Sequence, residues 1–137
     1  TINNQPLDYV SSGQTFNINL GYEIINQSDV SNVRVGITCF NQMGVAIFAQ
    51  HTRLAGKEFH DIPPTGEFVC MIEDLPLPPS IYYIQVHLKV NELLADRIDN
   101  AAQMQVIEGD YLHNGKIPTA KEGLVLVRGD WMLREQV

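Results

Sequence analysis

The sequence predicts an all-β fold, an immunoglobulin-like antiparallel β-sandwich, and three observations support this class. Apolar residues recur at every second position over most of the chain, which is the pattern of half-buried strands. Segments rich in Pro, Gly, Asn and Ser separate these runs, where turns are expected. No segment shows a convincing helical period. Six or more strands joined by turns are typical of two packed sheets.

The expected strands follow from this alternation, element by element. In "TFNINLGYEI", residues 15–24, apolar side chains alternate with Asn, Gly and Glu. The run "VRVGITCFN" leads through a tight Gly-containing turn into "VAIFAQ", so 33–50 is expected to be a hairpin. The stretch "VNELLADRID" fits either a short helix or a hairpin tip at Asn91-Glu92. Further strands are expected at 67–72, 81–90, 101–107 and 124–133, with turn-forming connections at 26–29, 63–66 and 76–80.

Length and charge narrow the possible functions. A chain of 137 residues forms one domain, too short for a second independent unit. The net charge of -7 and nine scattered Lys and Arg argue against nucleic acid or anionic membrane as a partner, because such ligands require clustered cations. No run approaches the roughly 18 apolar residues that span a bilayer. The opening Thr1-Ile2 has neither an initiator Met nor a signal-type leader, so we expect a piece excised from something longer.

No catalytic residue, metal site or cofactor is expected from the motifs. The nucleophile elbow, the phosphate loop and the dinucleotide fingerprint are all absent. The acidic residues single out no pair of the kind that a glycosidase places across its cleft. The histidines do not pair at metal-ligand spacing, and there is no Cys-x-x-Cys. The histidines in question are His51, His60, His87 and His113.

The two cysteines leave two alternatives open. Cys39 and Cys70 both fall on apolar faces of expected strands, which favours two buried free thiols. An inter-sheet disulfide of the antibody type would normally place a tryptophan between the cysteines, whereas Trp131 follows both. We therefore expect free thiols, with a disulfide as the alternative.

The strand at 81–90 carries an unusual outer face. Its even positions, from Tyr82 to Val90, are uniformly apolar and must face the core, so its odd positions point outward. In an immunoglobulin-like order this strand shares a sheet with 33–40 and 101–107, so their outward residues merge into one patch. We interpret this patch as a carbohydrate-binding site formed by Arg34, Thr38, Tyr83, Gln85, His87, Lys89, Gln103 and Gln105, with Phe40 also exposed beside them.

The chemistry of this patch suits a sugar. Planar amides and charged ends match the paired hydroxyls of a pyranose, an aromatic ring stacks on its C–H side, and Arg or Lys can contact a carboxylate or phosphate on a glycan. The alternative is that these residues are simply solvated, because the outer face of any sandwich strand is polar.

The C-terminal run "GLVLVRGDWMLREQV" contains the tripeptide Arg128-Gly129-Asp130, which adhesion proteins present to integrins. An integrin ligand must sit on an exposed turn. Here, however, the odd positions around Gly129 are apolar, so the tripeptide lies within a strand pattern. We expect a strand with Trp131 as its anchor, and Gly129 easing a bulge or a close approach.

The order of these features resembles a known family. The segments are "GYEIINQSDVSNVRVGITCFNQMGVAIFAQHT", "GEFVCMIEDLPLPPSIYYIQVHLKV", "DRIDNAAQMQVIEGD" and the closing "GLVLVRGDWML". Together they are similar to the C-terminal domain of the ATP-binding protein of O-antigen polysaccharide ABC transporters, the Wzt type. The match covers nearly the whole chain, although no fixed sugar-contact motif can be carried over from the family.

The resemblance implies a non-catalytic module that binds O-antigen polysaccharide near its non-reducing terminus and so couples it to export. It also implies a homodimer formed by exchange of a C-terminal strand at 123–133, after a connection at 108–122. The dimer strand would include Leu124, Leu126, Val127 and Trp131. An ATPase domain on the N-terminal side and a membrane subunit of the transporter would be its partners, in the cytoplasm at the inner membrane.

Two other hypotheses stay open at this point. An extracellular immunoglobulin-like adhesion or accessory carbohydrate-binding domain would be supported by Arg128-Gly129-Asp130 and by an oxidised pair of Cys39 and Cys70. A glycoside-processing enzyme would have to turn over a glycan, and nothing in the sequence supports one.

Overall fold

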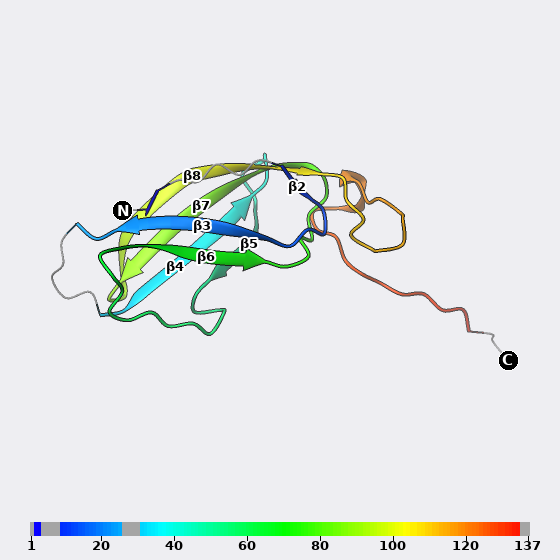
Figure 1. The fold of residues 1–137 in the computed structure, drawn as a ribbon. Helices are drawn as coiled ribbons and strands as arrows, with labels where there is room; N and C mark the ends of the chain where they lie inside the picture. The colour runs from blue at the N-terminus through cyan, green and yellow to red at the C-terminus, as the bar shows by residue number, and fades with distance from the viewer. Residues whose placement is uncertain (1, 4–8, 26–30, 135–137) are drawn as a thin grey trace.

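The structure is a computed structural model that describes residues 2–3, 9–25 and 31–134. Strands and turns account for its regular structure, so the predicted all-β class is confirmed (Figure 1). None of the described residues belongs to a helix long and apolar enough to cross a membrane. The strands are β1 (Ile2–Asn3), β2 (Tyr9–Ser11), β3 (Phe16–Glu23), β4 (Val33–Phe40), β5 (Ala46–His51), β6 (Thr65–Ile72), β7 (Ser80–Val90) and β8 (Leu93–Ile107), followed by the 3-10 turn η1 (Ala120–Glu122).

The strands form two sheets. The smaller sheet has the order β1-β3-β6 and the larger one β2-β8-β7-β4-β5. Figure 1 shows β3 and β6 lying across the larger sheet, as the two layers of a sandwich do. Every pair is antiparallel except β2 and β8, in which Val10 lies beside Val106 in a parallel ladder. The strand β2 has three residues, too few for an alternating pattern to reveal it.

The core lies between the two sheets and follows the predicted alternation. The larger sheet contributes the inward positions of β4, β7 and β8, including the fully buried Ile37, Ile84 and Met104. Leu75 and Leu77 of the proline-rich connection after β6 close one end of the core. The backbone carbonyl of Leu77 accepts a hydrogen bond from the Ser12 hydroxyl at 2.6 Å, which satisfies a buried polar group.

The hairpin alternative for the segment after β7 is correct and the helix alternative is wrong. Asn91 and Glu92 form the tip, with φ values of 50° and 70°, as a two-residue turn of the primed type requires. The strand expected at 101–107 therefore begins at Leu93. Two irregularities interrupt the ladder between β7 and β8, and the displaced residues break the alternation that the sequence pattern depends on.

The strand expected at 124–133 is not formed. The backbone N–H of Leu126 donates to the carbonyl of Pro76 at 2.7 Å, and the Leu126 side chain is buried. Beyond this point the chain runs away from the body (Figure 1), and Trp131 and Leu133 are 95% and 98% exposed. A strand exists only where a neighbouring strand completes its hydrogen bonds, and in the described part of this chain none lies beside the segment.

Cys39 and Cys70 are free thiols, as the favoured alternative predicts. Cys39 lies on β4 and is fully buried, and Cys70 lies on the inner face of β6 opposite Ile18. Burial raises the pKa of the Cys39 thiol to about 12, so it is an unreactive core residue.

Candidate functional site

The outer face of the larger sheet, which points away from the core, carries the residues singled out from the sequence. In the β4–β7 register Arg34 lies opposite Lys89, and Thr38 lies opposite Gln85. In the β7–β8 register Gln103 lies opposite Tyr83. The residues Arg34, Thr38, Tyr83, Gln85, His87, Lys89, Gln103 and Gln105 are therefore on three adjacent strands of one sheet, as the strand-order argument predicts.

A groove on this face is lined by only some of these predicted residues. It is a groove of about 640 Å³, which we call the central groove. Of the eight predicted residues, Tyr83 and Gln85 line it, and Arg34 and Lys89 lie several residues away along their strands. Its lining consists of Phe40, Asn41, Gln42, Gly44, Tyr83, Gln85, Arg97, Asp99 and Asn100.

Three planar polar side chains, those of Gln85, Arg97 and Asp99, are hydrogen-bonded to one another in the central groove. The Asp99 Oδ1 atom accepts a hydrogen bond from Gln85 Nε2 at 2.7 Å and one from Arg97 Nε at 3.0 Å. The Arg97 contact and then the Gln85 contact lower the pKa of the Asp99 carboxyl below its ordinary value. The groove thus holds an ionised carboxylate, an amide and a guanidinium beside the Tyr83 and Phe40 rings.

The alternation of the sequence does not reveal that Arg97 and Asp99 line this groove. Both residues lie on β8 next to an irregularity at which Ile84 pairs with Ala102 but Val86 pairs with Ile98. The extra residues include Asn100, whose φ is 52°. Alternation cannot be extended through such a bulge, so the outward direction of Arg97 is not readable from its sequence position.

A glycine on β4 shapes the other half of the outer face. Gly36 lies opposite His87 on β7 and opposite His51 on β5. A Cβ atom on Gly36 would lie 2.5 Å from two atoms of the His87 ring and 2.8 Å from the His51 Cβ. The imidazole of His87 therefore lies directly over the backbone of β4, in space that any other residue would fill.

Burial, followed by the neighbouring His51, Lys89 and Arg97, lowers the pKa of His87 below its ordinary value. The ring therefore carries less positive charge near neutral pH than an exposed histidine would. Within the described residues, no three His, Cys, Asp or Glu side chains gather in a way that could hold a metal ion.

A second cavity lies on the side of the sandwich where β5 and β6 are the outermost strands of their sheets. We call it the edge cleft, and its volume is about 500 Å³. Apolar residues of both sheets line it, among them Val35, Phe59 and Phe68. It opens beside β6, whose Val69 and Met71 side chains are each 57% exposed.

The fold and the outer face define the chain as an immunoglobulin-like sandwich domain with a polar and aromatic groove on its larger sheet. The chain belongs to the Wzt C-terminal domain family, whose model matches residues 2–124. The resemblance drawn from the ordered sequence motifs is thereby confirmed.

A solved structure agrees with this assignment. The crystal structure of the C-terminal domain of Wzt aligns with a TM-score of 0.73 over 92% of this chain and 74% of that one. The two sequences are 12% identical, so this likeness establishes the shared fold alone. A search of curated proteins finds no significant match.

Proposed function

We propose that this domain is a non-catalytic glycan-recognition module that binds O-antigen polysaccharide and couples it to export by an ABC transporter. Membership of the Wzt C-terminal domain family supports the O-antigen ligand. The observation that carries the proposal is the central groove, in which aromatic rings lie beside a tied set of amide, guanidinium and carboxylate groups.

The chemistry of the central groove fits a pyranose. The Tyr83 and Phe40 rings offer apolar faces for the C–H side of a sugar. Gln85, Arg97 and Asp99 offer donors and acceptors in fixed positions for its hydroxyls. These three groups are already bonded to one another, so binding requires little ordering of side chains. An open groove on a sheet face also suits a polymer, and the non-reducing terminal sugars are the part we propose to be bound.

We also propose partners and a cellular location for the domain. An ATPase domain preceding this one and the membrane subunit of the transporter would be its partners, on the cytoplasmic side of the inner membrane. Recognition by this domain would then select the polysaccharide that the ATPase exports.

We further propose that two copies pair by exchanging their C-terminal segments, expected at 123–133 after the connection at 108–122. Leu126 is buried in its own domain, so the part beyond Arg128 would reach the partner. The exposed apolar residues beyond Arg128, which leave the body of the domain, support this (Figure 1). Among the described residues β6 pairs only with β3, so its other edge offers backbone groups, and the adjoining edge cleft offers an apolar surface, to a strand from the partner. Strand exchange is a common route to a symmetric dimer.

The glycan proposal is tested by calorimetric titration of the domain with purified O-antigen polysaccharide of the source strain. We expect saturable binding that Tyr83→Ala weakens by about 1–3 kcal/mol, as loss of a stacked aromatic contact does. The matched control is Tyr9→Ala, which removes an exposed tyrosine of β2 outside the central groove. Equal affinities for the two variants and the parent would show that the groove is not the site.

A further inference from the structure

A small polar pocket lies beside the first residues of β4, at the end of the outer face away from the central groove. We call it the basic pocket, and its volume is about 320 Å³. Arg34 belongs both to its lining and to the outer face, so the pocket continues the surface proposed to bind the glycan. Its lining residues are Asn32, Val33, Arg34, Arg53, Gly56, Lys57 and Glu58.

The basic pocket is lined mainly by positively charged side chains, whereas the chain as a whole is acidic. The chain has a net charge of -7 and only nine Lys and Arg, yet three of these, Arg34, Arg53 and Lys57, line this one pocket. A fourth, Lys89, lies opposite Arg34 in the β4–β7 register. Cations this close repel one another, and a bound anion would offset that repulsion.

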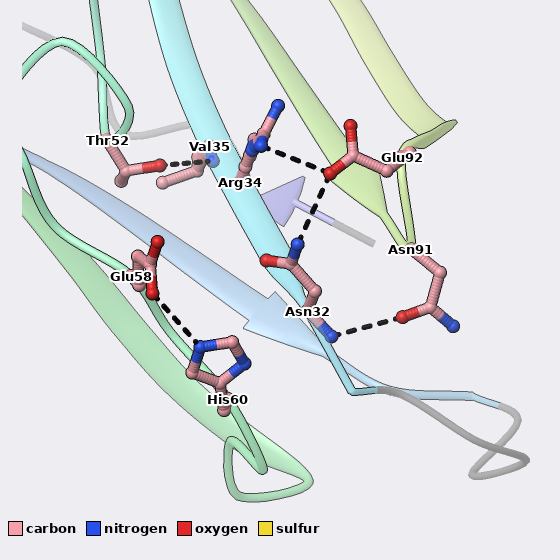
Figure 2. A network of polar contacts seen from close by, with 8 residues as sticks. All are labelled: Asn32, Arg34, Val35, Thr52, Glu58, His60, Asn91 and Glu92. Carbon is pink, nitrogen blue, oxygen red and sulfur yellow. Dashed lines mark hydrogen bonds and ion pairs between the residues drawn. The ribbon is translucent and has the colours of Figure 1, made fainter.

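Most of these cations have no ion-pair partner among the residues that the structure describes. In the described part of the chain, neither Arg53 nor Lys57 forms an ion pair. Arg34 pairs through Nη2 with the Glu92 carboxylate at 3.1 Å, and Figure 2 shows the two side chains meeting beside β4. A guanidinium has five N–H donors, so this single contact leaves Arg34 able to bind a second anion.

The local backbone holds these groups in place. The Thr52 N–H donates to the Val35 carbonyl at 3.0 Å, and the Thr52 hydroxyl accepts from the Val35 N–H (Figure 2). In the turn that follows, the Lys57 N–H donates to the Thr52 carbonyl at 2.9 Å, and the Gly56 N–H donates to the Arg53 carbonyl at 3.1 Å. The loop that carries Arg53 and Lys57 is therefore fixed against β4 before any ligand binds.

The one carboxylate in the pocket lining has its own partner. Glu58 Oε2 lies 3.5 Å from His60 Nε2 (Figure 2). His60 Nδ1 lies 2.8 Å from the Ser31 carbonyl oxygen. The contact with Ser31, followed by that with Glu58, raises the pKa of His60 above its ordinary value. Glu58 therefore has a histidine partner outside the pocket lining, and the ring offsets the charge of the carboxylate whenever it is protonated.

We propose that the basic pocket is a subsite for an anionic group on the bound glycan, a carboxylate or a phosphate, held by Arg34, Arg53 and Lys57. Guanidinium groups match the paired oxygens of both anions. The pocket has room for one charged group or one sugar, whereas a nucleic acid or a lipid surface requires cations spread along a tract. The identity of the polymer that carries the anion rests on the proposed function.

The test uses 1H–15N NMR of the domain at low ionic strength with three probes: inorganic phosphate, D-glucuronate and neutral methyl glucoside. We expect saturable shifts of the Asn32, Gly56 and Lys57 amides with phosphate, glucuronate or both, and none with methyl glucoside. Tighter binding of glucuronate would identify a carboxylate ligand, and tighter binding of phosphate would identify a phosphate substituent.

Paired variants separate the pocket from general charge. The double variant Arg53→Gln/Lys57→Gln should weaken anion binding at least about tenfold, since two charge-assisted contacts are lost. The control Lys116→Gln/Lys121→Gln makes the same charge change at exposed positions elsewhere and should bind as the parent does. Equal weakening in both double variants, or no saturable shift with either anion, would overturn the proposal.

The anion subsite and the glycan-binding function can fail independently of each other. If O-antigen polysaccharide binds the parent and Arg53→Gln/Lys57→Gln equally well, the subsite is wrong and the glycan module stands. If phosphate or glucuronate binds at the basic pocket but the polysaccharide does not bind the domain, the glycan function fails and the anion site stands.

Discussion

At the centre of the larger sheet, the imidazole of His87 occupies the space that a side chain on Gly36 would take. Gly36→Ala would place a methyl group 2.5 Å from that ring, so the ring or β4 must move. Overpacking of this kind costs roughly 1–3 kcal/mol of unfolding free energy, which urea denaturation would measure.

The matched control for this prediction is Gly129→Ala. A Cβ atom at Gly129 meets nothing within 4 Å, so the same chemical change should leave the stability unaltered. If the two alanine variants unfold at the same urea concentration, the packing of His87 over Gly36 is not as described.

Two histidines should titrate on opposite sides of the ordinary value of 6.5, His60 above it and His87 below it. His60 is hydrogen-bonded to Ser31 and Glu58, whereas His87 is partly buried beside cationic neighbours. NMR titration of the ring protons, assigned with His60→Gln and His87→Gln, measures both. Finding the pKa of His87 equal to or above that of His60 would contradict both environments.

The signs of the two effects on stability are opposite. The contribution of His60 is fully present below pH 6.5 and is lost as pH rises through its higher folded pKa. The contribution of His87 is present above pH 6.5 and is lost as pH falls through its lower folded pKa. From these two groups, the unfolding free energy should be highest near pH 6.5 and should fall as the pH moves away from it in either direction.

Arg128, the arginine of the Arg-Gly-Asp tripeptide, contacts three groups of its own chain. Its guanidinium carbon lies 4.6 Å from the centroid of the Tyr111 ring, and Nη2 donates to the Tyr111 carbonyl at 3.4 Å. The same group lies 3.8 Å from the Asp74 carboxylate. The arginine of the Arg-Gly-Asp sequence therefore contacts the body of its own chain, although its side chain is 46% exposed.

At the scale of elements, strands with an uninterrupted alternation were predictable and the others were not. β3, β4 and β7 each bury every second residue, so the core and the outer face follow directly from the sequence. The first half of β8 contains two register shifts and loses that alternation. The same shifts place Arg97 and Asp99 in the central groove. They therefore explain why neither the first half of β8 nor this side of the groove was predictable from the sequence.

The turn between β7 and β8 also joins two distant segments. The Asn91 side-chain oxygen accepts hydrogen bonds from the Ser31 N–H at 3.2 Å, the Ser31 hydroxyl at 2.8 Å and the Asn32 N–H at 3.0 Å. Asn91→Ala removes this acceptor and puts alanine at a φ of 50°. We expect a loss of about 1–3 kcal/mol in unfolding free energy, measured by urea denaturation.

Asn91→Gly separates the two causes in that prediction. Glycine accepts the positive φ without strain, so a loss in Asn91→Gly reports the missing hydrogen bonds and the greater freedom of glycine in the unfolded chain, and no backbone strain. If neither variant is less stable than Asn17→Ala, an exposed asparagine substitution on β3, the Asn91 contacts do not stabilise the fold.

At the scale of the whole molecule, the sequence predicted the class of fold but not how each part pairs. Alternation identifies a strand, yet the choice of neighbour depends on distant residues, as with β2, which lies parallel to β8. The pattern at 124–133 is equally strand-like, but its neighbour is absent from the described part of the chain. Whether that segment finds its partner in a second copy is therefore a question about assembly.

The last prediction concerns that assembly. Leu126 is 5% exposed and Arg128 is held by Tyr111, so both stay with their own domain. Deleting residues 129–137 should therefore give a folded monomer, whereas the full chain should be a dimer by analytical ultracentrifugation. Deleting 123–137 also removes the buried Leu126 and should cost roughly 2–4 kcal/mol more, leaving the protein monomeric or insoluble.

A point substitution in the full chain tests where the exchanged segment binds. Val69→Lys puts a charge on the exposed face of the β6 edge and should also yield monomers, because inserted charge opposes strand addition. The matched control Asn19→Lys adds the same charge to β3, the middle strand of the smaller sheet, and should leave the dimer intact. A dimer that survives deletion of 129–137 would rule out exchange of the segment beyond Arg128. A dimer that is lost on deletion but retained in Val69→Lys would place the exchanged strand away from β6.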